Sequence, residues 1–302
     1  MRPSAAHAVA VLGMFFISTT FSVGDEIADA MPASVLMAIR FGGAVILFAP
    51  FVMWRYSPKW PGFSGLWRYG LLSIFSSIFF WTMFEGLKTT GSLNSGAIST
   101  LVPAFTGIYG AVLMRERLGR YRWAAIVIGL AGALWVVFRG DPARLVALEL
   151  SEGDAIFFGG CVSMGLYAAL IPKLHRGEPV AVMSFWFLLI TALGFLALSN
   201  TALARIDWGA VETGVWGGLA WLVLGPTLLT FFIIQATSIA IGSTRVQAYS
   251  YLIPAFVLFI DWVSGRGLPS AMTIPGIAIV LLATLVIQRG VIAEGAVRTA
   301  RS

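Results

Sequence analysis

The sequence predicts an all-α integral membrane protein, with ten transmembrane helices arranged as two inverted five-helix repeats. Three observations carry this prediction: a very apolar composition, ten long apolar segments and an internal duplication. Of the 302 residues, 58% are hydrophobic and only 11% are charged, and the mean hydropathy is +0.87. A soluble domain of this size needs many more polar residues to cover its surface, so a soluble enzyme is excluded.

Ten segments are long and apolar enough to cross a bilayer, because a membrane helix needs about 20 mostly apolar residues. The strands of an outer-membrane barrel would alternate apolar and polar residues, whereas these segments are continuously apolar. The first segment lacks a clear Ala-x-Ala cleavage site, so we expect a retained helix rather than a signal peptide. The ten segments cover residues 5–24, 33–54, 67–88, 91–114, 120–138, 153–172, 179–199, 213–239, 243–265 and 272–288.

The distribution of basic residues predicts a multi-pass protein with both termini in the cytoplasm. The composition, with 17 arginines and 3 lysines and much alanine and glycine, indicates a GC-rich bacterial genome and therefore predicts the inner membrane. With the N-terminus inside, 14 of the 20 lysines and arginines lie on the inner side and five on the outer side, while Arg40 lies within a segment. Cytoplasmic loops are enriched in such residues. The net charge of +6 therefore reflects basic residues in the cytoplasmic loops and does not indicate a nucleic-acid partner. The expected surroundings are the lipid bilayer.

Residues 89–105 and 240–256 resemble each other at an offset of 151 residues. Eight of the 17 aligned positions are identical without a gap, and they include the pair Pro103 and Pro254. A match of this quality predicts an internal duplication.

The duplication divides the chain into a first repeat over residues 1–150 and a second over residues 151–302. Each repeat holds five predicted segments, an odd number, so the second repeat enters the membrane from the opposite side. Inverted repeats of this kind are typical of secondary transporters, which bind their substrate near the bilayer midplane between the repeats.

Several short motifs are distributed along nearly the whole chain. They are Ala38-Ile39-Arg40-Phe41, Gly86 to Pro103, Arg115-Glu116-Arg117-Leu118 with Trp123 and Gly129 to Gly132, Gly153-Asp154, Tyr167-Ala168 and Leu252-Ile253-Pro254. In this combination the chain resembles the ten-helix, EamA-type members of the drug/metabolite transporter superfamily over nearly its whole length. One departure follows the ninth segment, where the family often has a glutamate and this chain reads Gly265-Arg266-Gly267-Leu268. The resemblance implies transport of small molecules, a class that includes amino acids, nucleosides, sugars and drugs.

Polar and helix-breaking residues inside the segments are the candidates for substrate binding. Pro103 and Pro254 lie at the centres of their segments, where proline removes a backbone donor and kinks the helix. The alternative for each candidate is ordinary helix packing. The predicted substrate-binding set is Arg40, Trp81, Glu85, Asn94, Ser99, Pro103, Gln235, Tyr249, Pro254 and Asp261.

Arg40 is the deepest basic residue, and a charge inside a membrane segment costs about 3 kcal/mol or more. It is therefore expected either to act on substrate or gating, or to form a salt bridge with Glu85 or Asp261. Glu85 could equally pair with Lys88, one helical turn further on. Either acid could also carry a proton for coupled transport.

Other features leave alternatives open. Small residues along the fifth and eighth segments, including Gly129 and Gly218, predict close packing within the chain or in a homodimer. The acidic run Asp25 to Asp29 resembles half of a prenyltransferase metal motif, but no second acidic motif accompanies it. With one cysteine and two distant histidines, neither a metal nor a cofactor is expected.

We therefore expect a non-enzymatic secondary transporter that moves small metabolites or drugs across the cytoplasmic membrane by alternating access, in the direction of export. The alternative from another class is an intramembrane enzyme that acts on a lipid substrate. A non-transporting assembly or sensor protein would need a larger interface than these short loops provide.

Overall fold

The structure is a computed structural model that describes residues 3–113, 120–138, 140–143, 150–267 and 271–283, and within these ranges it contains helices and no strand. Eight helical segments of the described chain are long and apolar enough to cross a membrane. The helices are α1 (Pro3–Ile27), α2 (Ala33–Tyr56), α3 (Phe63–Thr90), α4 (Ser92–Ser99), α5 (Val102–Leu113), α6 (Arg120–Val137), α8 (Glu152–Leu174), α9 (Val180–Leu203), α10 (Thr213–Leu222), η1 (Val223–Leu229), α11 (Thr230–Ile241), α12 (Ser243–Ala248), η2 (Tyr249–Leu252), α13 (Ile253–Val263) and η3 (Ala271–Thr273).

Eight of the ten predicted segments correspond to these long apolar segments, which confirms the all-α membrane class. The fifth and tenth correspond to α6 and to the apolar helix Ala271–Ala283, whose apolar stretches are shorter within the described residues. The motif at residues 115–118 lies outside the described residues.

The two duplicated stretches have the same local structure. α3 and α11 both end at a glycine with positive φ, Gly91 at 83° and Gly242 at 88°, a conformation that glycine adopts without steric cost. The following helix is interrupted in both copies just before its proline: α4 gives way to α5, which includes Pro103, and α12 passes through η2 into α13, which includes Pro254. The breaks expected at the two prolines therefore occur.

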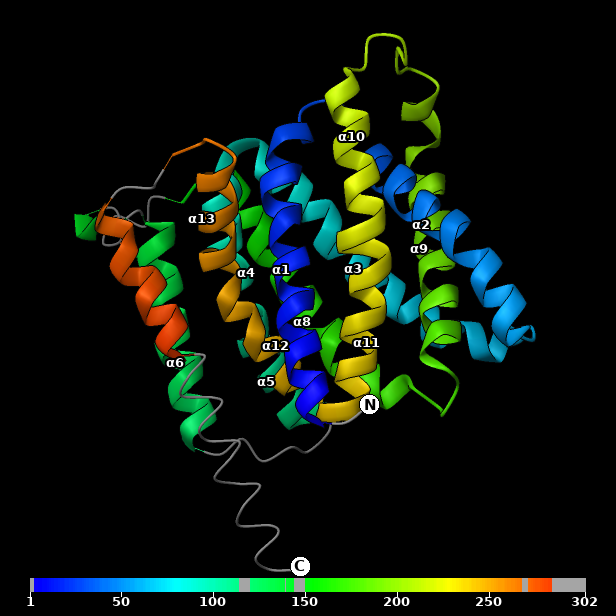
Figure 1. The fold of residues 1–302 in the computed structure, drawn as a ribbon, viewed down its shortest axis with the longest axis horizontal. Coiled ribbons are helices and arrows are strands. Elements are labelled where there is room, and N and C mark those ends of the chain that lie inside the picture. The colour runs from blue at the N-terminus through cyan, green and yellow to red at the C-terminus, as the bar shows by residue number, and fades with distance from the viewer. Residues whose placement is uncertain (1–2, 114–119, 139, 144–149, 268–270, 284–302) are drawn as a thin grey trace, which may run out of the picture.

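The long helices pack in matched pairs (Figure 1). α2 runs along α9 at one edge of the bundle, and α6 lies beside residues 271–283 at the opposite edge. α3 packs along α8, while α1 packs along the continuous α10, η1 and α11. α5 contacts α8, and α13 contacts α1.

The surface and the interior have the polarity expected of a protein in lipid. Large apolar side chains such as Ile46, Trp54, Phe63 and Leu198 are exposed, whereas many serine and threonine side chains are buried. The buried hydroxyls are used between helices, as where Ser184 donates to the Gln235 amide oxygen at 2.6 Å. Bonds of this kind hold helices together where no water is present to compete.

At one end of the bundle, Glu178 in the loop between α8 and α9 joins that loop to α3. Its carboxylate accepts hydrogen bonds from Arg68 and Tyr69, each at 3.0 Å, and from the backbone N–H of Arg176 at 2.8 Å. Burial raises the pKa of Glu178, but the backbone hydrogen bonds, the Tyr69 hydroxyl and the Arg68 charge outweigh it, so the pKa lies below its ordinary value of 4.5.

The lowered pKa of Glu178 predicts a pH dependence of stability. Because the folded state favours the ionised carboxyl, its stabilisation is fully present above the unfolded-state pKa and is lost as the pH falls through the folded-state pKa, below 4.5. Glu178→Gln should lower the melting temperature at neutral pH, and the gap to the wild type should close as the pH falls into that window. Melting curves in detergent measure it. Glu212→Gln, at an exposed residue before α10, is the control, and a gap independent of pH contradicts the prediction.

Gly165 of α8 allows close contact with α5. A Cβ at this position would meet the Phe105 side chain and would lie 3.0 Å from the backbone nitrogen of Thr106. Gly165→Ala should therefore destabilise the fold by about 1–3 kcal/mol, the usual cost of overpacking. Gly159 on the same helix has nothing within 4 Å of its Cβ position, so Gly159→Ala should be neutral or slightly stabilising. Equal melting temperatures for the two variants would show that this contact is not tight.

Candidate functional site

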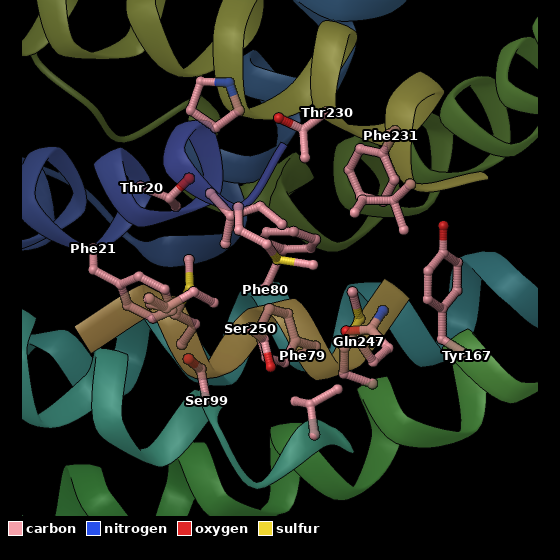
Figure 2. A pocket seen from close by; sticks show the side chains of 18 of the residues that line it. Thr20, Phe21, Phe79, Phe80, Ser99, Tyr167, Thr230, Phe231, Gln247 and Ser250 are labelled. Atoms are coloured by element: carbon pink, nitrogen blue, oxygen red, sulfur yellow. The ribbon is translucent and has the colours of Figure 1, made fainter. Parts of the chain in front are cut away.

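A cavity lies among the middle parts of the helices that pack across the two halves (Figure 2). The space free of protein atoms in and around it is about 600 Å³, a volume that includes open solvent. α1, α3, α8 and α11 contribute walls, together with the breaks before Pro103 and Pro254. The lining residues are Met14, Ile17, Thr20, Phe21, Arg40, Phe79, Phe80, Met83, Ser99, Val102, Met164, Tyr167, Pro226, Thr230, Phe231, Ile234, Gln247, Ser250 and Ile253.

More than half of the lining residues correspond to one another at the offset that relates residues 89–105 to residues 240–256. These residues lie 151 positions apart in the sequence, and each member of a pair faces the same cavity. They come from α3 with its counterpart in α11, and from the two interrupted helices. The pairs are Phe79 and Thr230, Phe80 and Phe231, Met83 and Ile234, Ser99 and Ser250, and Val102 and Ile253.

Arg40 is completely buried and lines the cavity. Its Nε donates to the Thr227 hydroxyl at 2.5 Å, and its guanidinium carbon lies 4.8 Å from the centre of the Phe80 ring. Within the described part of the chain, its two terminal nitrogens have no hydrogen-bond acceptor. Glu85 bonds Lys88 at 2.6 Å instead, as the alternative in the sequence analysis expected.

Thr227 reaches Arg40 from an irregular turn. The π-helix η1 contains Pro226, which has no backbone N–H to continue a regular helix. The turn brings both Pro226 and Thr230 to the cavity, and Thr230 donates its hydroxyl to the Gly225 carbonyl at 3.0 Å. Single π turns within α-helices occur often at functional sites.

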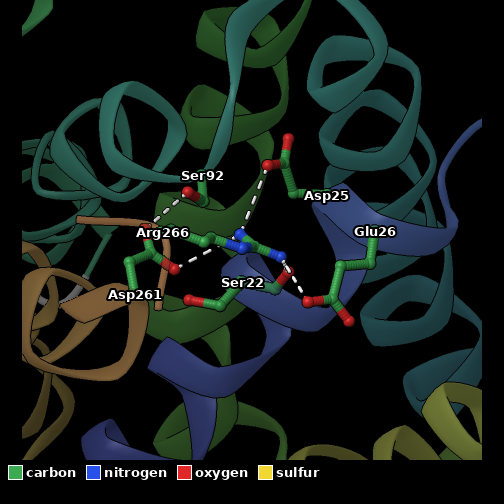
Figure 3. Close-up of polar contacts among 6 residues, drawn as sticks. All are labelled: Ser22, Asp25, Glu26, Ser92, Asp261 and Arg266. Atoms are coloured by element: carbon green, nitrogen blue, oxygen red, sulfur yellow. Dashed lines mark hydrogen bonds and ion pairs between the residues drawn. The ribbon is translucent and has the colours of Figure 1, made fainter. Parts of the chain in front are cut away.

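Asp261 lies in a different cluster (Figure 3), near the end of α13, which is at the opposite end of the bundle from the loop between α8 and α9 (Figure 1). Arg266, in the segment after α13, bonds Asp261 at 3.3 Å, Glu26 at 2.6 Å and Asp25 at 3.4 Å. Asp261 also accepts a hydrogen bond from Ser92 at the start of α4, at 2.8 Å. The Arg266 cluster therefore joins α1, α4 and α13. Two carboxylates of the acidic run that resembled a metal motif are paired with this arginine.

Of the remaining predicted residues, some lie in the lining or directly beside it, and others lie away from the cavity. Ser99 lines the cavity, and Pro103 directly follows the lining residue Val102, as Pro254 follows Ile253. Gln235 is buried next to the lining, where its amide nitrogen donates to the Tyr167 hydroxyl at 3.5 Å.

Tyr249 bonds the His7 ring at 2.8 Å, and Asn94 is half-buried in α4; neither belongs to the lining. Trp81 is 45% exposed on the outer face of α3, although its neighbour Phe80 lines the cavity.

Sequence reasoning did not select Thr227 or Arg266. The only sequence signals were a hydroxyl next to Pro226 and a loop arginine five residues after Asp261. Of the small residues that left packing or a homodimer open, Gly129 lies against Tyr251, and Gly218 lies against Val23 and Ile27. These two positions serve packing within the chain.

Comparisons with known proteins agree with this architecture. Residues 4–138 match the EamA-like transporter family. The chain is 24% identical over 213 residues to the uncharacterized transporter YyaM of Bacillus subtilis (strain 168), covering 70% of this chain and 69% of that one. It is 23% identical over 295 residues to the riboflavin transporter of Vibrio cholerae serotype O1, covering 92% of each chain.

A solved crystal structure shares the fold at 20% sequence identity. The TM-score is 0.70, and the superposition covers 94% of this chain and 96% of that one. The chain is thus a multi-pass membrane protein, and its residues 4–138 are similar to the EamA-like transporter family.

Proposed function

We propose that this protein is a secondary transporter that carries a small organic solute through the cavity at the interface of two inverted five-helix repeats, residues 1–150 and 151–302. The observation that carries the proposal is the composition of the cavity wall. Its paired residues come from equivalent positions of the duplication, as expected for a site on the pseudo-two-fold axis between inverted repeats.

The packing of the helices supports the same symmetry. In the proposed repeats, α3 is equivalent to α11, α8 to α1, and α5 to α13. The contact of α3 with α8 then has its equivalent in that of α11 with α1, and the contact of α5 with α8 in that of α13 with α1. α2 and α9 are each other's equivalents and pack together. Two halves of similar structure and opposite orientation can exchange conformations, which would open the site to each side of the membrane in turn.

The charged clusters at the two ends would then act as gates. The Arg266 cluster joins α1 and α4 to α13, across the repeats. The Glu178 cluster joins α3 to the loop after α8, again across the repeats. Alternating access would break one cluster while the other holds. The distribution of basic residues favours an orientation with the Glu178 end and both termini in the cytoplasm, and we propose the inner membrane as the location.

Export and proton coupling stay predictions from the sequence. Glu85 and Asp261, the two acids considered as proton carriers, both bond basic residues outside the cavity lining. A role of Asp261 in coupling would therefore act on the Arg266 cluster, whereas Glu85 pairs with Lys88 of its own helix and belongs to neither gate. The relatives are named as transporters, which favours transport over the intramembrane enzyme.

The test is solute flux into proteoliposomes, with variants that separate the cavity from the outer surface of the same helices. Phe80 and Phe231 line the cavity, while their neighbours Trp81 and Phe232 are 45% and 38% exposed. Phe80→Ala and Phe231→Ala should each lower flux by about tenfold, since each loses an aromatic contact of about 1.5 kcal/mol. Trp81→Ala and Phe232→Ala should transport like the wild type.

Riboflavin, aromatic amino acids and arylalkyl carboxylates form the solute panel, followed by mass spectrometry. Melting temperatures within a few degrees of the wild type would show that the variants are folded. Equal flux in all four variants would contradict the assignment of the cavity, and a stronger loss in Trp81→Ala would move the substrate to the outer face of α3. Flux of no solute by folded wild-type protein would count against transport itself.

A further inference from the structure

Arg40 brings a single, uncompensated charge to the cavity. It is the only charged side chain among the described residues that line the wall, and both Glu85 and Asp261 bond other cations. α2 and α9 each have 24 residues and each begin directly after a proline, so the position equivalent to Arg40 in the second repeat is Phe187, which lies outside the lining. The positive charge is thus contributed by one repeat only, without an equivalent charge from the other.

The hydrogen bonds of Arg40 leave one particular edge of its guanidinium available. Nε is used by Thr227 at 2.5 Å, whereas Nη1 and Nη2 are buried and have no acceptor within the described ranges. These two nitrogens form the end of a planar fork, and a carboxylate can accept from both at once through two parallel hydrogen bonds. A neutral carbonyl would satisfy only one of them and would leave the charge uncompensated.

Aromatic rings hold the guanidinium without using its hydrogen-bond donors. Its carbon lies 4.8 Å from the ring centre of Phe80 and 5.8 Å from that of Phe41. Contacts with the ring faces stabilise a buried cation, and they leave the donor edge free for a ligand. Phe80, Thr227 and Arg40 therefore form a preorganised anion-binding group.

The rest of the cavity suits an apolar body. Phe21, Phe79 and Phe231 contribute aromatic surface, as Figure 2 shows, and methionines from three helices add to it. No acidic side chain belongs to the described lining, so the ammonium group of an amino acid would lose its hydration without gaining a counter-ion. A dianion such as a phosphate monoester would meet only one positive charge.

We infer that the substrate is a small organic monoanion, with one carboxylate held by Arg40 and an apolar or aromatic body in the remainder of the cavity. This inference rests on the proposed transport function and narrows its substrate class. It replaces the wider expectation of amino-acid-like solutes by one in which the carboxylate is required and the ammonium is unfavourable.

Three probes of the same skeleton test the inference on the purified full-length protein: 3-phenylpropanoate, 3-phenylpropanamide and phenylalanine. Binding is measured by ligand-induced thermal stabilisation at millimolar concentrations, and uptake is measured in proteoliposomes. The wild type should bind the carboxylate at least about tenfold more tightly than the amide or the amino acid, a ratio equivalent to about 1.4 kcal/mol.

Variants of Arg40 provide the second arm. Arg40→Gln should remove the preference for the carboxylate and leave binding of the amide unchanged. Arg40→Lys should retain part of the preference, because lysine keeps the charge and loses the planar fork. Arg55→Gln, at an exposed residue of the same helix, is the matched control and should behave as the wild type. The comparison of probes on the wild type alone remains decisive where an Arg40 variant does not fold.

The outcomes separate the inference from the proposed function. Carboxylate binding that depends on Arg40 without uptake of any probe would keep the anion site and reject transport. Uptake of the amide or phenylalanine as fast as the carboxylate would reject the anion site and keep transport. Failure of the wild type to bind 3-phenylpropanoate, or equal stabilisation by chloride, would overturn the assignment to an organic monoanion.

Discussion

The structure depends on one constraint: a polar group inside a bilayer must be satisfied by the protein itself, because no water is available. This requirement explains why hydroxyl groups are buried at helix contacts and why large apolar side chains are exposed. It also explains the close helix approaches at glycines such as Gly165, where side chains would hold the helices apart. The cavity is the place where the requirement is relaxed, since broken helices and polar side chains meet there.

The two similar stretches of the chain, residues 89–105 and 240–256, both contribute to the cavity. Each copy contributes an interrupted helix with a proline just after the break, and both breaks meet at the cavity. Interrupted helices are tolerated at membrane depth where the broken backbone is enclosed by protein or lines a cavity, as it does at both breaks here. The symmetry of the wall is therefore a consequence of the fold, and the equivalent aromatic residues Phe80 and Phe231 illustrate it.

Departures from symmetry give the site its chemical character. Arg40 and the π turn that positions Thr227 have no counterpart in the other half of the lining. Burying the guanidinium of Arg40 costs desolvation free energy. Contacts with aromatic rings, a hydrogen bond to one hydroxyl and, in the inferred complex, a substrate carboxylate offset that cost. The acidic residues Glu178 and Asp261 belong instead to clusters at the two ends of the bundle. In the proposed transporter, the charge in the middle would select the solute and the charges at the ends would regulate access.

The sequence by itself determined the membrane class, the long apolar helices, the corresponding breaks at Pro103 and Pro254, and the choice of Arg40 as a candidate residue. These properties depend on composition, length and local backbone chemistry, which neighbouring residues specify. Only the tertiary structure decided between the possible partners of Arg40, because Thr227 is 187 residues away and reaches it through a π turn. It also placed Phe80 inside and Trp81 outside. Adjacent residues on a helix point in different directions, and only the packing of the other helices shows which direction faces the cavity.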